Sequence, residues 1–264
     1  MKLLSYFALL VHISVLLSCS GSKTLNLNKP NIENDTLRVG ISSNYPPVVF
    51  KDSDNMNAGI EIELANELSS STGISIKFVE LDWDKLIPSL MNEEIDVIMS
   101  GMSITADRRQ LIDFTEPYMQ TGQMVLIKSS DVLRFRTVEG IYKPNIRIGY
   151  EADTTGEQFV KSNLTESVSF EYKSAEEGIT ALMIGYTDYF IHDAPTIWKY
   201  TLDFSNTKLT GFYTPLTKEY LAWGVRKGDT QLLEYLNANI KKLEQDGIIQ
   251  KIKNKWLPTI IKAK

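Results

Sequence analysis

From residue 37 onward, short apolar segments alternate with longer amphipathic ones, and this alternation constrains the fold more than any other feature of the sequence. The short segments have the length and composition of strands; they are 37–41, 74–79, 95–99, 146–150, 168–172 and 188–191. Between them apolar residues recur at helical spacing, as at Ile60, Leu64 and Leu68 ahead of Gly73. Strands joined by helices in this order form parallel sheets that helices cover on both faces. The sequence therefore predicts the α/β fold class.

Capping residues mark several helix starts. Thr105 follows the third strand candidate, and Asp229 precedes a long C-terminal helix that Gly247 ends. Thr155-Gly-Glu-Gln158 and Ser174-Ala-Glu-Glu177 both have the spacing of a capping box. We expect one helix to begin at each of these four positions.

The N-terminal segment has the composition of a secretory signal. It is apolar from residue 3 to residue 17, which is shorter than the ~20 residues that span a bilayer as a helix. It ends in Leu-Leu-Ser-Cys19, which resembles the lipobox of bacterial lipoproteins, so we expect residues 1–18 to be a signal peptide and Cys19 to carry a lipid. The alternative is a thiol left behind an ordinary signal peptide. Residues 19–36 are then the lipidated end and a flexible tether.

Charge and composition exclude several classes of protein. The chain has 33 acidic and 28 basic side chains and a formal net charge of −5, which argues against a nucleic-acid partner. Its single cysteine, Cys19, excludes an internal disulfide. The only histidines are His12 and His192, too few for histidine catalysis or a metal site. Without a Gly-x-Ser-x-Gly elbow or a phosphate loop, the sequence predicts no catalytic residues, no metal and no cofactor.

Candidate binding residues follow the predicted strands, because ligands of open α/β sheets bind at the carboxyl ends of strands. These residues are Ser42, Tyr45, Trp83, Gly101, Ser103, Arg108, Glu151, Thr155, His192 and Asp193. Arg108 lies in the first turn of a predicted helix, where its guanidinium can hold a carboxylate bidentately. The alternative is a solvated surface arginine, which is the role we expect for Arg109.

The other candidates also have alternatives. Tyr45 and Trp83 lie next to turns; each alone is more typical of a core, whereas together they can enclose a ligand side chain. Asp193 can cap the helix that follows it or pair with a ligand ammonium. His192 can be a structural histidine.

Six segments with a known pattern occur in order along the chain. They are Leu37-Arg-Val-Gly-Ile with Tyr45-Pro-Pro, Gly59-Ile-Glu-Ile-Glu-Leu-Ala65, Asp82-Trp-Asp-Lys-Leu-Ile-Pro-Ser-Leu90, Ile95-Asp-Val-Ile-Met-Ser-Gly-Met-Ser-Ile-Thr-Ala-Asp-Arg108, Ile112-Asp-Phe-Thr-Glu-Pro-Tyr118, and Asp246-Gly247 with Trp256. From Leu37 to Leu257 the chain thus resembles the polar amino acid-binding proteins of ABC transporters, solute-binding family 3. The resemblance implies a monomeric, non-enzymatic protein that is anchored by lipid in the periplasm or at the cell surface. It would deliver a free amino acid, glutamine or a basic one, to a permease.

The resemblance also implies a type II periplasmic-binding fold, with two α/β lobes, a two-strand hinge and a ligand cleft between the lobes. Lobe one would comprise residues 37–121 and 219–264, and lobe two residues 122–218. The two crossings would fall near 121–123 and 217–221.

Roles for the ends of the ligand follow from the same resemblance. Arg108 and the backbone N–H groups of Ser103 and Thr155 would hold the α-carboxylate. Asp193, the Gly101 carbonyl and the Ser103 hydroxyl would hold the α-ammonium.

The ligand side chain would lie between Tyr45 and Trp83. Ser42 stands where members that read glutamine or cationic side chains often have Asp. His192 matches glutamine-binding members, and Glu151 on the opposite lip favours a cationic or amide ligand.

Two departures bear on alternative functions. Asp153 stands where glycine is usual. Thr196 stands three residues after Asp193, where the related cyclohexadienyl and arogenate dehydratases carry a catalytic acid, which argues against that enzyme class. A ligand-sensing lipoprotein on the same fold is the other alternative.

Overall fold

The computed structural model describes residues 30, 33–202 and 208–257. The predicted signal peptide and the predicted lipidation site Cys19 lie outside the described residues, as do most of the predicted tether and residues 258–264. None of the helices in the described ranges is long and apolar enough to cross a membrane.

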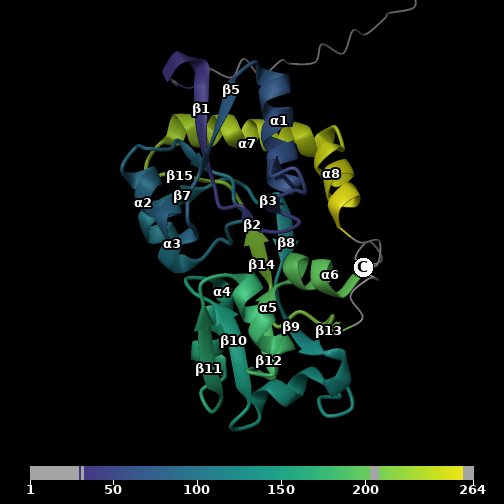
Figure 1. Cartoon of the computed structure of the whole chain (residues 1–264). Coiled ribbons are helices and arrows are strands. Elements are labelled where there is room, and N and C mark those ends of the chain that lie inside the picture. The colour runs from purple at the N-terminus through teal and green to yellow at the C-terminus, as the bar shows by residue number, and fades with distance from the viewer. Residues whose placement is uncertain (1–29, 31–32, 203–207, 258–264) are drawn as a thin grey trace, which may run out of the picture.

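A five-stranded sheet forms the upper lobe in Figure 1, in the order β5-β1-β6-β15-β7. Its strands are β1 (Thr36–Ile41), β5 (Ser75–Glu80), β6 (Val97–Ile98), β7 (Ile112–Phe114) and β15 (Gly224–Arg226). β1 pairs in parallel with β5 and β6, whereas β15 pairs antiparallel with β6 and β7. Beyond the end of β1 follows a small antiparallel sheet of β2 (Asn44–Tyr45), β3 (Val49–Lys51) and β4 (Asn57–Ala58).

The second sheet lies in the lower lobe, in the order β11-β10-β12-β9-β13. Its strands are β9 (Gln123–Lys128), β10 (Arg147–Glu151), β11 (Val168–Tyr172), β12 (Tyr189–Asp193) and β13 (Leu209–Phe212). β10 pairs in parallel with β11 and β12, while β9 pairs antiparallel with β12 and β13. In both sheets the first parallel strand lies between the next two, and such a reversal of strand order opens a crevice at the carboxyl ends.

Two short strands connect the lobes. The chain leaves the first sheet through β8 (Met119–Thr121) and returns from the second through β14 (Glu219–Leu221). β8 and β14 pair antiparallel, with Thr121 opposite Glu219. The predicted two-lobed α/β architecture is confirmed, whereas hinge motion and the residue limits of the lobes stay predictions.

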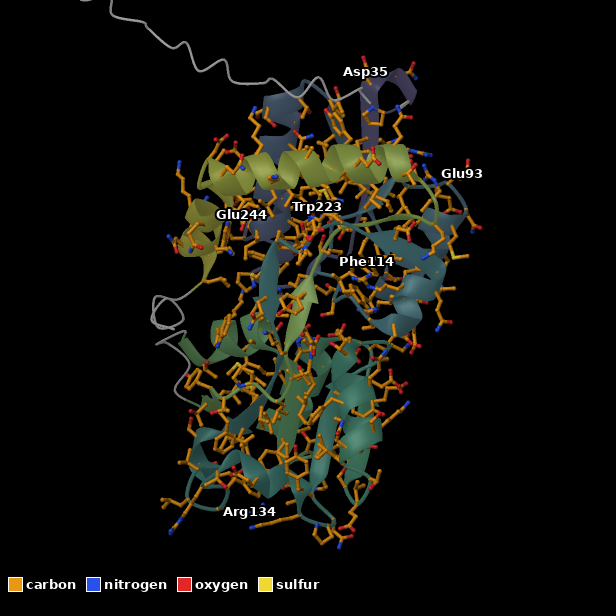
Figure 2. The ribbon with its side chains drawn as sticks, turned by 180° about the vertical axis from the view of Figure 1, so that it is seen from behind. Asp35, Glu93, Phe114, Arg134, Trp223 and Glu244 are labelled. Atoms are coloured by element: carbon orange, nitrogen blue, oxygen red, sulfur yellow. The ribbon has the colours of Figure 1, made fainter. Side chains whose placement is uncertain are left out.

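Helices cover the faces of both sheets. They are α1 (Ile60–Thr72), α2 (Leu86–Met91), α3 (Ala106–Leu111), α7 (Thr230–Gln245) and α8 (Ile248–Trp256) on the first lobe, and α4 (Thr155–Asn163), α5 (Ala175–Met183) and α6 (Ala194–Leu202) on the second. Figure 1 shows α7 crossing the upper lobe beside α1 and α8. From behind, Figure 2 shows Trp223 inside this lobe, where it belongs to the same apolar core as residues of α1 and α7.

Strand β9, which lies between β12 and β13, is buried on both faces. Met124 and Leu126 pack against residues of α5 and α6, whereas Val125 and Ile127 pack on the other side with residues of α4. A strand with two buried faces is apolar at successive positions and lacks the period of two. The sequence analysis did not predict β9 as a strand.

The prediction of purely parallel sheets is wrong. The antiparallel strands β9 and β15 enter their sheets directly from the other lobe, through β8 and β14, rather than through a helical crossover. Without a crossover, the chain is free to enter in either direction. The strand predicted at 95–99 is also shorter, at Val97–Ile98, and helix α8 after Gly247 was not predicted.

Three of the predicted caps are confirmed. The side chains of Thr105, Ser174 and Asp229 each accept a hydrogen bond from the backbone N–H three residues later. The cap of α4 is Thr154, so the capping box predicted at Thr155 is wrong by one residue.

Candidate ligand-binding cleft

A cleft that is partly open to solvent lies between the lobes. It is lined by all ten residues predicted from the sequence, which are Ser42, Tyr45, Trp83, Gly101, Ser103, Arg108, Glu151, Thr155, His192 and Asp193. Asn44 and Thr154 line it as well, and each is the immediate neighbour of a predicted residue. The structure thus brings the ten residues together, while their roles in binding stay predictions.

The topology explains why residues so distant in sequence meet. Ser42 follows β1 and Gly101 lies shortly after β6, while Glu151 ends β10 and Asp193 ends β12. Within each sheet these strands run parallel, so their carboxyl ends lie at one edge. The two edges face each other across the cleft.

Arg108 is a buried cation at this cleft. It lies in α3 and is 8% exposed, so the alternative of a solvated surface arginine is wrong for Arg108, whereas Arg109 is exposed. Its Nη1 donates to the Ser103 carbonyl at 2.9 Å, and its Nη2 donates across the cleft to the Asp153 carbonyl at 3.1 Å. Burial lowers the pKa of the guanidinium, although nearby carboxylates oppose this. Within the described residues Arg108 forms no ion pair, so its charge is available to an anion.

Asp193 is a buried carboxylate on the other lobe. It is the last residue of β12, is 9% exposed, and its Oδ1 accepts a hydrogen bond from Gln123 Nε2 at 2.6 Å. Burial raises the pKa of Asp193 to about 6, against the charges of His192 and Arg108, which lower it. Asp193, too, forms no ion pair with any described residue.

Glu219, which the sequence analysis missed, contacts residues that line the cleft. It begins β14, and its carboxylate accepts hydrogen bonds from Ser103 Oγ of the first lobe and Thr155 Oγ1 of the second, both at 2.7 Å. Gln123 Nε2 donates to it at 3.2 Å and also contacts Thr155 and Asp193. The sequence placed Glu219 in a crossing segment, but gave no signal that its side chain contacts residues of both lobes. Glu219 links both lobes to the connecting strands.

The two aromatic residues have different surroundings. The Tyr45 ring is buried and meets the His192 ring edge-on, with centroids 5.9 Å apart. Trp83 donates from Nε1 to the Asp153 carbonyl at 3.0 Å, and its ring lies under the Arg108 guanidinium. Asp153 has φ of 58°, in the left-handed region where glycine is favoured, which accounts for the glycine that the resemblance led us to expect there.

His192 and Glu151 form a buried pair in the cleft wall. Nε2 of His192 lies 2.8 Å from Oε2 of Glu151, and the imidazole is 5% exposed. Burial alone would lower the pKa of His192, but the hydrogen bond and charge of Glu151, together with Asp193, raise it above 6.5. Among the residues that the structure describes, no group of three or more His, Cys, Asp or Glu is placed to hold a metal ion.

The backbone of Gly101 is held by a hydrogen bond to the buried side chain of Glu61. Its φ is 66°, and an added Cβ would lie 2.6 Å from Cε1 of Tyr45, so only glycine fits. Its N–H donates to Oε1 of Glu61 at 2.9 Å. Glu61 thus positions the loop that follows β6.

Residues 37–259 match the sequence profile of the bacterial extracellular solute-binding proteins, family 3. The chain belongs to this family. A family 3 relative, the ABC transporter arginine-binding protein 1 of Escherichia coli (strain K12), is 29% identical over 85% of this chain and 91% of its own. The ABC transporter glutamine-binding protein of Bacillus subtilis (strain 168) is 27% identical over 97% of this chain and 96% of its own.

Solved structures give the same result for the fold. The crystal structure of an ancestral amino acid-binding protein, described as a precursor of cyclohexadienyl dehydratase, matches with a TM-score of 0.79 and 31% identity. The match covers 86% of this chain and 97% of that one. The resemblance to family 3 and the predicted two-lobed fold are confirmed.

Proposed function

We propose that this family 3 protein binds a free polar amino acid in the cleft and delivers it to the permease of an ABC transporter. The observation that carries the proposal is the pair of buried, opposite charges on two different lobes. Arg108 and Asp193 are 8% and 9% exposed, both line the cleft, and neither forms an ion pair within the described residues. A desolvated charge without a counter-ion is costly, so the pair favours a ligand that carries both charges.

An α-amino acid is such a ligand. We assign its carboxylate to Arg108, with the backbone N–H groups of Ser103 and Thr155. We assign its ammonium to Asp193, with the Gly101 carbonyl and the Ser103 hydroxyl. Charge-assisted hydrogen bonds of this kind are about twice as strong as neutral ones.

Glutamine or a basic amino acid is the ligand that we favour. The side-chain end of the cleft has the aromatic rings of Tyr45 and Trp83, the Ser42 hydroxyl, and the polar pair Glu151 and His192. Polar groups left unpaired by an apolar ligand would cost about 1–3 kcal/mol each, which disfavours leucine. A glutamate side chain would bring a second carboxylate next to Glu151, whose partner His192 can offset only one negative charge.

Binding without catalysis is part of the proposal. Thr196, at the position where the resemblance expects the catalytic acid of a dehydratase, is fully buried and has no carboxyl group. The arginine- and glutamine-binding relatives are named as binding proteins.

We also propose that Cys19 carries the lipid that anchors the protein in the periplasm or at the cell surface. The residues between Cys19 and β1 would then tether the two lobes to the membrane, because Thr36, predicted to end the tether, belongs to β1. Lobe one would comprise 37–121 and 219–264, and lobe two 122–218. The tether keeps the cleft near the permease.

A thermal-unfolding screen of the common amino acids tests the proposal. A ligand at a hundred times its Kd adds about 2.7 kcal/mol to the free energy of unfolding and raises Tm accordingly. We expect glutamine, arginine, lysine or histidine to raise Tm, with D-enantiomers as matched controls that do not. A response to leucine or glutamate alone, or to no amino acid, would contradict the proposal.

A further inference from the structure

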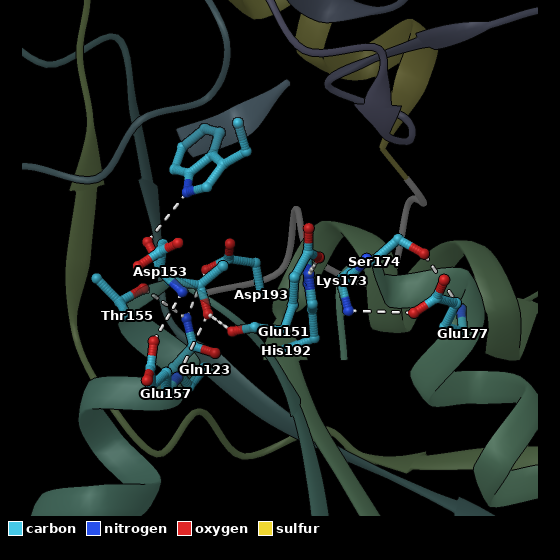
Figure 3. Close-up of polar contacts among 12 residues, drawn as sticks. Gln123, Glu151, Asp153, Thr155, Glu157, Lys173, Ser174, Glu177, His192 and Asp193 are labelled. Atoms are coloured by element: carbon cyan, nitrogen blue, oxygen red, sulfur yellow. Dashed lines mark hydrogen bonds and ion pairs between the residues drawn. The ribbon is translucent and has the colours of Figure 1, made fainter. Parts of the chain in front are cut away.

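The relatives of this chain include proteins named for a cationic amino acid and for a neutral amide, so family membership leaves the charge of the ligand side chain open. The wall of the cleft that faces the ligand side chain holds one ion pair. In Figure 3, Glu151 from β10 meets His192 from β12, with Oε2 and Nε2 2.8 Å apart. The His192 side chain is buried, with 5% of its surface exposed, whereas that of Glu151 is partly buried, with 12% exposed.

Glu151 and His192 are the residues of the cleft that can interact with a charged side chain of the ligand. In the proposed function Asp193 is engaged by the α-ammonium, and Glu219 is engaged by the hydroxyls of Ser103 and Thr155. Glu151 is the carboxylate left for a ligand cation, and its partner His192 holds it.

We propose that the Glu151–His192 pair makes the charge preference of the cleft depend on protonation: a neutral amide binds against the intact pair, whereas a cationic side chain binds Glu151 only when His192 gives up its proton. This inference rests on the proposed function. The bond that breaks is Nδ1–H of the imidazolium, because Nδ1 has no hydrogen-bond partner among the described residues, whereas Nε2–H faces Glu151. The proton goes to solvent, and the ligand ammonium or guanidinium takes over the charge of Glu151.

Charge balance in a buried site is the physical reason. A protonated His192 with an ionised Glu151 is neutral as a pair, and a ligand cation would add one uncompensated positive charge. Two positive charges that are close together and shielded from water repel each other strongly. Loss of the imidazolium proton from His192 removes one of them and restores neutrality. The same cation beside Glu151 lowers the pKa of His192 in the complex.

The groups around His192 favour its charged form before a cation binds. Glu151 on β10 and Asp193 on its own strand raise the pKa of His192, while burial opposes them. Tyr45 on β2 presents its ring edge, and the partner of His192 across the ladder to β9 is the uncharged Met124.

The sign of the pH dependence follows. Affinity for arginine or lysine should rise by up to about tenfold per pH unit below the pKa of His192 in the unliganded protein and level off above it. Affinity for glutamine or citrulline should lack this dependence. Citrulline is the matched probe, because it has the shape of arginine without the charge.

Calorimetry in buffers of different ionisation enthalpy, from about pH 6 to about pH 9, measures the protons released. The purified full-length protein should release up to one more proton with arginine or lysine than with glutamine or citrulline. Any proton lost from Asp193 is common to all four ligands and cancels in this difference.

Variants assign the proton. His192→Gln should abolish the extra release, whatever the affinity becomes, because His192 is the only histidine that follows the predicted signal peptide. The imidazole of His192 should also show, by nuclear magnetic resonance, a lower pKa with arginine bound than with glutamine bound. If His192→Gln fails to fold, these parent measurements still decide the question.

Three results would overturn the inference: equal proton release with charged and neutral ligands, extra release that persists in His192→Gln, or no binding of arginine and lysine at any pH while glutamine binds. If no amino acid binds, the proposed function itself fails. The two failures are thus distinguishable.

Discussion

Glu61, the acid beneath Gly101, provides a stringent test of the account of the first lobe. The side chain is fully buried in α1, and its carboxyl accepts three hydrogen bonds: from Gly101 N and Tyr118 Oη at Oε1, and from Trp223 Nε1 at Oε2. Glu61→Gln keeps the shape but replaces one oxygen by NH₂. With the remaining oxygen toward Gly101, the amide NH₂ meets the indole N–H, and a buried unpaired donor costs about 1–3 kcal/mol.

The charge of Glu61 gives the prediction its pH dependence. Burial raises the pKa of Glu61 from 4.5 to about 7, although the three hydrogen bonds lower it. Between these values the native state binds more protons than the unfolded state, so the free energy of unfolding falls as pH rises. The difference between the two pKa values of Glu61 corresponds to about 3 kcal/mol of the free energy of unfolding. The Gln variant does not titrate and loses nothing over this range.

The assay is urea unfolding of parent and Glu61→Gln without ligand, at pH values from about 4.5 to about 8. The parent should be more stable by about 1–3 kcal/mol at the acid end, and this advantage should shrink by about 3 kcal/mol at the alkaline end. Glu67→Gln on the same helix, where the side chain is only partly buried, controls for the loss of a carboxyl. A difference between parent and Glu61→Gln that does not change with pH would refute the reasoning.

Three further predictions concern the ligand, the anchor and the lobes. Because burial raises the pKa of Asp193 to about 6 and its ionised form must hold the ammonium, glutamine affinity should fall by up to about tenfold per pH unit below that value; a flat calorimetric profile there would contradict the assignment. Cys19→Ala should abolish labelling of the protein by a radioactive fatty acid, and unchanged labelling would exclude Cys19 as the anchor. Small-angle scattering should show a smaller radius of gyration with saturating ligand than without, since two strands join the lobes; identical curves would speak against closure.

Local rules were enough for much of the fold and of the cleft. The helical periodicity that ends at Gly73 predicted α1. The ends of the predicted strands indicated that Ser42, Gly101 and Glu151 lie in one site, because parallel strands align their carboxyl ends whatever their separation in sequence. Caps such as Asp229 depend only on the next few residues, and they too could be predicted.

Features that depend on long-range pairing could not be predicted. The antiparallel entry of β15 is decided by the path of the chain between lobes, and Glu219 reaches Ser103 and Thr155 only once β14 pairs with β8. The contact between Glu151 and His192 likewise requires β10 and β12 to be neighbours. The cap of α4 was predicted one residue too late, because Thr154 and Thr155 are both threonines, which are favoured at helix N-caps.

The most direct test of the central claim is calorimetric titration of Arg108→Ala with the amino acid that most stabilises the parent. Without the guanidinium the ligand carboxylate is desolvated and unpaired, which typically costs about 2–5 kcal/mol, so affinity should fall by about thirtyfold or more. Arg109→Ala, which removes an exposed arginine one position away, should bind like the parent. If Arg108→Ala binds with parental affinity, the carboxylate clamp is wrong, and the assignment of an amino acid ligand loses the observation on which it rests.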